Sequence, residues 1–530
     1  MSGTYDIVFA GGGHNSLVAS AYLAAGGLKV LVLERNPWIG GGVVTRELTV
    51  PGFRHDQHST AHMLIQANPL IRNDELALQS RFGLKYIRPE ISVATIFEDG
   101  SRVLTYHDLD KTCESMARIS PRDAESYRRH VQRSLEMLPM FVTGLFAPPA
   151  PFGTFMSILE QSRQGRALIG VMNKSAFDIV DDLFENDKLK IHFLKYSSEA
   201  MAGPEEKGTG LIFSMLVGFV HAFHGGFPRG GSGALVDSLA RCITHYGGEI
   251  RTKCHVSRVV VEGGKARGVV LEGGEEIRAK RAVVGSFHPH LLKNYIGGID
   301  ADILTDAAKT QPGSYSSFVV NYALDSAPVY SALKDVSSPL MVELLPADFL
   351  KMRREFDSLR YGEVPECDSI VCFTNTNHDP TRAPAGKSIL YLYSFAPYGL
   401  ADGGPARWDA IKDDLADTML AKYRRYVTNM EPESIIARHI SSPLDNERTS
   451  LSFQKGDISG IGRYLYQFLG RRPTPELSQY AVPGIEGLYL CGPFMHPGGG
   501  VTGGGRAVAT KMMGDLGMDF GKVVDAVSRG

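Results

Sequence analysis

The stretch Asp6–Gly42, DIVFAGGGHNSLVASAYLAAGGLKVLVLERNPWIGGG, decides the fold of this chain. Its apolar residues 6–10 predict a strand, residues 16–25 predict a helix, and residues 29–33 predict a second strand. Glycines fill the first turn, and Glu34 follows the second strand. This pattern is typical of a β-α-β unit that binds a dinucleotide, although a purely structural unit of this kind is the alternative.

Each part of this unit has a physical role. Gly11 permits the tight turn, and Gly13 lets the backbone approach a pyrophosphate at the helix N-terminus. Glu34 is placed to accept hydrogen bonds from ribose hydroxyls. Ser16 stands where the third glycine of the motif usually lies, so we expect a slightly looser contact between helix and strand.

Length and composition indicate a globular protein of more than one domain. The chain has 530 residues, of which 43% are hydrophobic and 22% charged. Its net charge of −2 provides no electrostatic footprint for nucleic acid. The six cysteines show no ligand-like spacing, and the first strand begins too early to leave room for a signal peptide. We therefore expect reduced cysteines and a cytoplasmic protein.

Two apolar stretches need an explanation. Leu211–Phe223 is too short to span a membrane and contains His221, so it predicts a buried helix or an apolar wall of a substrate cavity. Residues 138–155 are apolar and rich in proline, which favours a packed loop, with a mobile lid or a membrane-touching surface as alternatives.

A group of histidines follows the first unit. His55, His58 and His62 lie close together with Asp56, but no second cluster completes a four-ligand set. We expect no metal site, and we interpret this segment as a loop that lines the cofactor or the substrate.

The order of motifs predicts a discontinuous nucleotide domain. Strands separated by glycine turns return over residues 255–286, and the pairs Gly263-Gly264 and Gly273-Gly274 are predicted hairpin turns. The fold class is α/β, a Rossmann-like domain built from residues 1–60, 226–292 and 480–530. An α+β insertion, residues 61–225 and 293–479, forms the substrate-binding or lid domain.

A second glycine-rich turn lies near the end of the chain. Residues 487–492 predict a buried strand, PFMHPGGGVT follows, and a helix is expected from about residue 503 to 516. The positive end of such a helix suits the negatively charged pyrimidine edge of a reduced flavin. A plain nicotinamide site does not require this second turn.

With both turns in view, the sequence resembles the FAD-dependent phytoene desaturase-like oxidoreductases, within the glutathione reductase and amine oxidase flavoprotein group. The matching stretches are AGGGHNSLVASAYLAAGGLKVLVLER, GGFPRGGSGALVDSLA, the strands around Val256 and GLYLCGPFMHPGGGVTGGG. The resemblance also extends to the branch of pyridine nucleotide-disulphide oxidoreductase domain-containing proteins, although no paired redox cysteines exist here.

The resemblance implies FAD as cofactor and a set of residues that contact it. The pyrophosphate would meet Gly11, Gly13 and His14, the adenosine ribose Glu34, and the adenine the backbone of Val256. The same cofactor would be lined by Asn15, Arg35, Gly40, Gly41, Gly42, Gly492, Pro493, Gly500, Val501 and Thr502. Pro493 stands where many relatives carry an acid, which puts the contact with the ribityl chain in doubt.

The reaction that the resemblance implies is a dehydrogenation that introduces a C=C bond, with hydride passing to flavin N5. The expected substrate is small and apolar or alicyclic, bound against Phe219 and Phe223, and O₂ or a quinone accepts the electrons. His496, followed by His58 and His224, is the candidate catalytic residue, with a structural histidine as the alternative for each. Two other interpretations stay open: an amine oxidase-type enzyme that uses O₂, and a flavin-containing interaction protein without turnover. Peripheral contact with a membrane also stays open.

Overall fold

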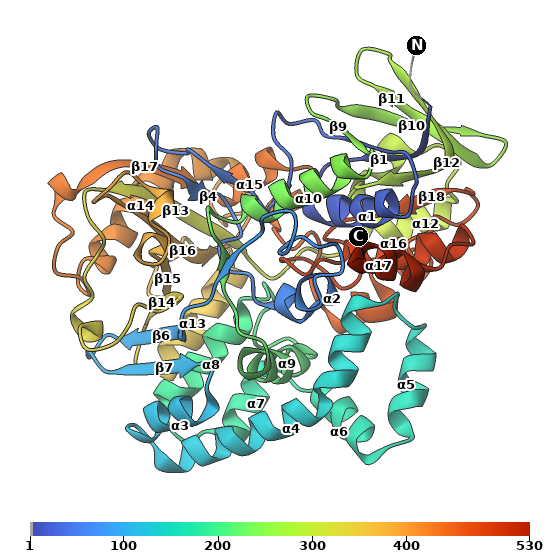
Figure 1. Ribbon diagram of the computed structural model, residues 1–530. Helices are drawn as coiled ribbons and strands as arrows, with labels where there is room; N and C mark the ends of the chain where they lie inside the picture. Colours follow the sequence, from blue (N-terminus) through green and yellow to red (C-terminus); the bar gives the residue numbers. More distant parts are fainter. Residues whose placement is uncertain (1–3, 530) are drawn as a thin grey trace.

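Two large β-sheets and a group of helices make up the molecule (Figure 1). The structure is a computed structural model, and it describes residues 4–529. In Figure 1 the first sheet lies at the upper right, the second at the left, and the helices α3–α9 at the bottom.

The first sheet contains strands from both the N-terminal and the C-terminal parts of the chain. Its strand order is β10-β11-β12-β1-β2-β9, and β18 also pairs with β12. The strands are β1 Tyr5–Ala10, β2 Val30–Leu33, β9 Glu249–Arg251, β10 Val256–Glu262, β11 Lys265–Leu271, β12 Glu276–Gly285 and β18 Leu488–Leu490. Strands β12, β1, β2, β9 and β18 run parallel, as expected for apolar strands covered on both faces.

The strand β12 joins two kinds of pairing. Its first half pairs antiparallel with β11, and its second half pairs parallel with β1, where Ala282 lies opposite Ile7. The glycine pairs at residues 263–264 and 273–274 connect antiparallel neighbours, which confirms the two predicted hairpins. After the second hairpin turn, residues 276–285 form one continuous strand.

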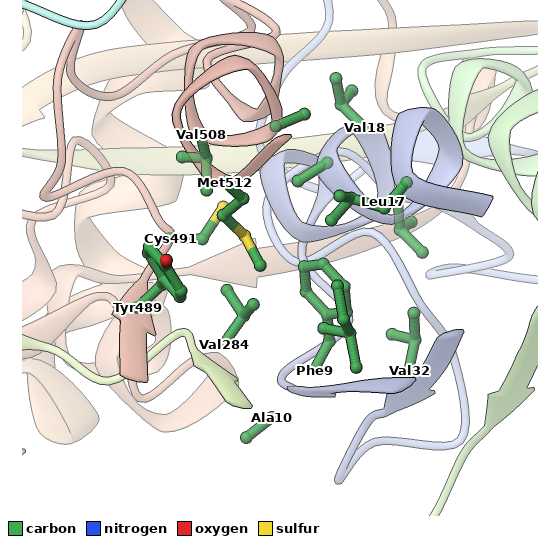
Figure 2. Close-up of a cluster of buried hydrophobic side chains, with 14 of the residues drawn as sticks. Phe9, Ala10, Leu17, Val18, Val32, Val284, Tyr489, Cys491, Val508 and Met512 are labelled. Atoms are coloured by element: carbon green, nitrogen blue, oxygen red, sulfur yellow. The ribbon is translucent and has the colours of Figure 1, made fainter. Parts of the chain in front are cut away.

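The core of this region forms between the sheet and the helices α1, His14–Ala25, and α16, Gly505–Asp515. Figure 2 shows Leu17 of α1 and Met512 of α16 above Phe9 and Val284 of the sheet, and all four side chains are fully buried or nearly so. Burial of one such side chain stabilises the fold by about 1.5–3 kcal/mol. The two helices approach closely, because a Cβ on Gly505 would lie 2.0 Å from the carbonyl oxygen of Asn15.

The second sheet has the order β17-β13-β16-β15-β14-β6-β7. Its strands are β6 Ile91–Phe97, β7 Arg102–Tyr106, β13 Ser316–Leu324, β14 Met341–Leu345, β15 Ile370–Phe373, β16 Ser388–Ala396 and β17 Ile435–Ser441. The turn at Asp99-Gly100 joins β6 to β7. Short strand pairs complete the set: β3 Thr45–Arg46 with β4 His55–Asp56, and β5 Tyr86–Ile87 with β8 Phe227–Pro228.

The helical group covers one face of the second sheet. It comprises α3 Leu109–Ala117, α4 Pro121–Phe146, α5 Phe152–Glu160, α6 Arg163–Met172, α7 Ala176–Leu183, α8 Asp187–Ser198 and α9 Thr209–Ala222. Residues 138–155, which the sequence favoured as a packed loop, are helical except for a short link. The helix α4 continues through Pro139 because its apolar face packs in a cluster around Leu138 and Phe141.

The remaining helices lie between or beside the two sheets. They are α2 Pro69–Arg72, α10 Gly233–His245, α11 Leu292–Tyr295, α12 Ala301–Ala308, α13 Phe349–Arg360, α14 Trp408–Tyr423, α15 Pro443–Thr449 and α17 Phe520–Arg529. No helix among residues 4–529 combines the length and the apolar character that crossing a membrane requires.

Candidate functional site

One large cavity, of about 380 Å³, extends from the end of β1 to the face of the second sheet. At one end it is lined by the glycine turns before α1 and α16. At the other end its walls are mainly apolar side chains: Met63, Leu64, Val93, Leu145, Phe146, Ile212, Met215, Leu216, Leu340, Met341, Phe373, Ile458 and Phe468.

The turn between β1 and α1 is shaped for close approach of a ligand. Gly11 has φ +113°, and a Cβ there would lie 2.7 Å from Cβ of Ser286. Gly13 has no protein atom within 4 Å of the position of a Cβ, so this face opens into the cavity. No side chain caps α1. The amide of His14 donates to the carbonyl of Gly40 at 3.2 Å, which leaves the amides of Asn15 and Ser16 free to bind an anion.

Glu34 lies directly after β2 and lines the same end of the cavity. Its Oε2 accepts a hydrogen bond of 2.9 Å from the amide of Gly12, and its Oε1 accepts one of 2.8 Å from the amide of Asn36. These bonds orient the carboxylate, while each oxygen keeps a lone pair for a ribose hydroxyl.

Gly40 is the one predicted cofactor residue that does not line the cavity. It has φ +112°, a Cβ there would meet the carbonyl oxygen of Val43 at 2.4 Å, and its amide donates to the carbonyl of Gly12 at 2.8 Å. Its role in the structure is to hold the neighbouring loop, because Gly41 and Gly42 do line the cavity. Arg35 and Val256 also lie at this end.

The second turn lies at the start of α16. Gly492, Pro493, Gly500, Val501 and Thr502 all line the cavity. No side chain caps α16, and the residues Gly500–Thr502 just before it are the part of this turn that faces the cavity.

A fully buried arginine holds this second turn in place. Arg472 donates hydrogen bonds to the carbonyl oxygens of Met495, Gly462, Ser459, Ile461 and Pro493, at 2.8–3.3 Å. Burial lowers the pKa of Arg472 to about 9. Because one side chain satisfies several loop carbonyls, the turn keeps a defined shape without regular secondary structure.

Several buried polar atoms around the cavity have no partner within the protein. They include Nε2 of His14, Oδ1 of Asn15 and Oγ1 of Thr502. Burial lowers the pKa of His14 to about 4, so its imidazole is neutral at neutral pH. Buried polar atoms normally have partners, and a dinucleotide across the two turns would supply them. The residues present therefore fit the predicted FAD.

Of the three candidate catalytic histidines, one lines the cavity and two do not. His58 lines the cavity, is buried, and neither ring nitrogen has a hydrogen-bond partner. His496 does not line the cavity, because its ring turns away and Nε2 bonds to the carbonyl of Gly144 at 2.8 Å. His224 also lies elsewhere, since it bonds to the carbonyl of Pro89 at 2.8 Å and stacks on His107.

The two phenylalanines predicted to bind substrate do not line the cavity either. Phe219 and Phe223 pack against each other in the cluster beneath α4 and α5. The helix α9 reaches the cavity with residues of the same stripe that lie nearer its N-terminus, Ile212, Met215 and Leu216. The apolar wall from this helix was thus expected, but one turn too far along it.

The sequence patterns did not predict that polar residues beside the second sheet line the cavity. Glu199, at the end of α8, lines the cavity together with Tyr196, Tyr391 and Tyr393. The sequence does hold one indication of them: side chains alternate between the two faces of a strand, so Tyr391 and Tyr393 of β16 point to the same face of the sheet. Nothing local indicated that Glu199 shares that face.

Two of the three histidines after the first unit, His55 and His62, form ordinary hydrogen bonds. His62 bonds to Tyr86 at 2.9 Å and to Ser232 at 3.1 Å, while His55 bonds to Thr49. In the described part of the chain, no group of three histidine, cysteine, aspartate or glutamate residues could hold a metal ion.

Comparison with known proteins decides the family. Residues 17–505 match the family described as flavin containing amine oxidoreductase. The chain belongs to this family. As a member of it, the protein is an FAD-dependent oxidoreductase, and FAD is its cofactor.

Similar proteins match this chain over nearly its whole length. The chain is 28% identical to one of the limonene dehydrogenase subunits of Castellaniella defragrans, over 97% of this chain and 95% of that protein. It is 29% identical to pyridine nucleotide-disulfide oxidoreductase domain-containing protein 2 of Rattus norvegicus, over 97% and 94%. Cyclohexylamine oxidase from Brevibacterium oxydans shares the fold, with a TM-score of 0.59, 15% identity and 99% of both chains covered.

Proposed function

We propose that this oxidoreductase removes two hydrogens from neighbouring carbons of a small apolar or alicyclic substrate and so introduces a C=C bond. The observation that carries this proposal is the cavity, which leads from the glycine turns of the FAD site into a chamber with mainly apolar walls. A substrate without polar groups must bind through buried area, at about 25 cal/mol per Å².

The residues of this chain bind and orient the reactants. The turn at Gly11 and Gly13 with the N-terminus of α1 would hold the pyrophosphate, and Glu34 the ribose. The N-terminus of α16, with Gly500 and Thr502, would face the pyrimidine edge. When bound, FAD supplies the acceptor for a hydride. The apolar side chains from α9 exclude water from the place where the C–H bond breaks.

The names of the related proteins support a carbon–carbon dehydrogenation. They include the limonene dehydrogenase of Castellaniella defragrans and a lycopene-forming phytoene desaturase of Pseudescherichia vulneris. The acceptor of the electrons in this proposal is O₂ or a quinone. Contact with a membrane surface would suit a substrate of low solubility, and Ile158 and Tyr466 are large apolar side chains exposed beside the helical group.

A second candidate function is the oxidation of a carbon–nitrogen bond. The observation that favours it is the group of tyrosines at the cavity, because the face of an aromatic ring attracts an ammonium ion. The carboxylate of Glu199 in the same wall would add to that attraction, but Lys195 pairs with it.

Anaerobic bleaching of the flavin tests these alternatives. FAD-loaded protein is mixed without oxygen with limonene, phytoene or cyclohexylamine, and the flavin absorbance is followed. We expect limonene or phytoene to bleach the flavin and cyclohexylamine to leave it oxidised. Bleaching by cyclohexylamine alone, with release of ammonia, would establish the second candidate. If no compound of any of these classes bleached the flavin, the result would favour a flavin-containing interaction protein without turnover.

A further inference from the structure

Three polar side chains, those of Thr95, Glu343 and Tyr393, lie in a row across the second sheet beneath the cavity. In the register of the sheet, Thr95 of β6 lies opposite Glu343 of β14, Glu343 opposite Val371 of β15, and Val371 opposite Tyr393 of β16. Residues that are paired in this way point to the same face of a sheet. Glu343 and Tyr393 therefore lie on one face, two strands apart.

The end of helix α8 covers this row with a pair of opposite charges. Lys195, whose side chain is fully buried, forms an ion pair with Glu199, and Tyr393 donates a hydrogen bond to the other carboxylate oxygen of Glu199. Lys195 also lies 4.1 Å from the centre of the Phe395 ring. Glu199 is thus held from two sides, and its carboxylate is the charged end of the cluster that reaches the cavity.

The cluster lies close to the second glycine turn. Arg463 donates one hydrogen bond of 3.0 Å to the carbonyl of Ala200 and another of 2.6 Å to the carbonyl of Gly499. One guanidinium group therefore joins the residue after Glu199 to the residue before Gly500. Glu199 faces the part of the cavity next to the turn that would hold the pyrimidine edge of FAD.

Glu343 lies behind this pair, away from the cavity. Burial raises the pKa of its carboxyl to about 7, Lys195 lowers it, and the charge of Glu199 raises it. Its Oε2 accepts a hydrogen bond of 2.9 Å from Thr95, and its Oε1 has no partner. If Glu199 becomes neutral, the charge that disfavours an ionised Glu343 disappears. Glu343 can then ionise, so the total charge of the cluster stays the same after Glu199 takes up a proton.

These contacts single out Glu199 among the groups at the cavity. We infer that Glu199 is the proton acceptor for the second hydrogen, an inference that rests on the dehydrogenation proposed above. One C–H bond breaks and its electron pair leaves with hydrogen as hydride to the flavin. The neighbouring C–H bond then breaks, its electrons form the new C=C bond, and its proton passes to the carboxylate of Glu199. The organic product has two hydrogens fewer, and the flavin is reduced by two electrons.

His58 is another titratable side chain in the cavity wall, and neither of its ring nitrogens has a partner. Burial lowers the pKa of His58 to about 4, which makes it a weak base at neutral pH. It is also not oriented by any hydrogen bond. Glu199 has an orienting donor and a paired cation, the arrangement that positions a general base. The titratable groups that face Glu199 are Lys195, Tyr196, Tyr315, Glu343, Tyr391 and Tyr393.

Binding of a phenol tests the inference without any turnover. FAD-loaded native protein is titrated with para-chlorophenol and with para-chloroanisole, which lacks the acidic proton, and the flavin spectrum reports occupancy. We expect the phenol to bind the native protein at least about tenfold more tightly than Glu199→Gln, because a hydrogen bond to a carboxylate is lost. The anisole should bind both proteins equally.

A matched control and a second variant keep the test decisive. Glu447 also accepts a hydrogen bond from a tyrosine, Tyr398, but does not line the cavity, so Glu447→Gln should bind the phenol like the native protein. If Glu199→Gln fails to retain FAD, Glu199→Asp replaces it. The aspartate keeps a charge opposite Lys195 and withdraws the carboxylate by one methylene, so the same loss is expected. Equal affinity of the phenol for the native protein and the Glu199 variant, or no binding to the native protein, would overturn the inference.

Kinetics separates this inference from the proposed function. With whichever of limonene and phytoene bleaches the native flavin, Glu199→Gln should slow the reduction by about 100-fold or more at unchanged FAD content. If no substrate bleaches the flavin, the proposed function fails, whereas the phenol titration still decides whether Glu199 accepts a proton in the cavity.

Discussion

Replacing Gly13 by alanine separates the binding of FAD from the stability of the fold. Gly13 has φ −66° and ψ 157°, a conformation that any residue adopts, and a Cβ there would meet no protein atom within 4 Å. The apoprotein of Gly13→Ala should therefore melt at the native temperature, or slightly above it because alanine restricts the unfolded chain.

The effect on FAD follows from the position of the added methyl group. It would stand in the cavity directly in front of the uncapped first turn of α1, where the pyrophosphate is expected. Displacing one charge-assisted hydrogen bond costs about 1.5–3 kcal/mol, which weakens FAD binding by about 10- to 100-fold.

Gly11 provides the matched comparison. A Cβ at Gly11 would lie 2.7 Å from Cβ of Ser286, at φ +113°, so Gly11→Ala should destabilise the apoprotein itself by about 1–3 kcal/mol. The assay is a fluorescence titration of each apoprotein with FAD, beside its melting curve without FAD. Native-like FAD affinity of Gly13→Ala would refute the placement of the pyrophosphate at this turn.

Further predictions concern the cavity wall, the second turn and the buried acid. Phe219→Ala should lower the free energy of unfolding by about 3–5 kcal/mol, because Phe219 is part of the packed cluster. Leu216→Ala, in the cavity wall, should chiefly weaken substrate binding. Melting curves measure the first effect and flavin-reduction kinetics the second. Arg472→Lys should cost about 3–5 kcal/mol and weaken FAD retention, because a lysine cannot satisfy the same loop carbonyls; native-like melting would contradict this role. Since the pKa of Glu343 is raised to about 7, its contribution to stability is complete below about pH 4.5 and is lost as the pH rises through 7. Urea unfolding at pH 5 and 8 should show a native advantage over Glu343→Gln that shrinks at pH 8 by up to about 3 kcal/mol, and a constant difference would contradict the shift.

The features that the sequence predicted well depend on neighbours along the chain. The glycine turn after β1, the hairpins at residues 263–264 and 273–274, and the helix after Thr502 are each set by a short stretch of residue types. Such stretches carry their own geometric requirements, such as a positive φ at Gly11. The two ends of the FAD site could therefore be recognised before their separation in space was known.

The features that the sequence did not predict depend on direction and register. His496 follows the correct strand, but its ring turns toward Gly144, and sequence position does not determine which way a loop side chain points. The row from Thr95 to Tyr393 exists only because β6, β14, β15 and β16 pair in one register. Its members are separated by up to about three hundred residues, so no local pattern could bring Glu199 and Glu343 together.

The central claim, carbon–carbon dehydrogenation at an FAD site, is tested most directly by the product of one anaerobic turnover. FAD-loaded protein is mixed with an excess of limonene or phytoene, the extent of bleaching gives the amount of flavin reduced, and mass spectrometry identifies the product. We predict one product molecule per reduced flavin, with the mass of the substrate less two hydrogens. A product that has gained oxygen, or bleaching without any dehydrogenated product, would contradict the account.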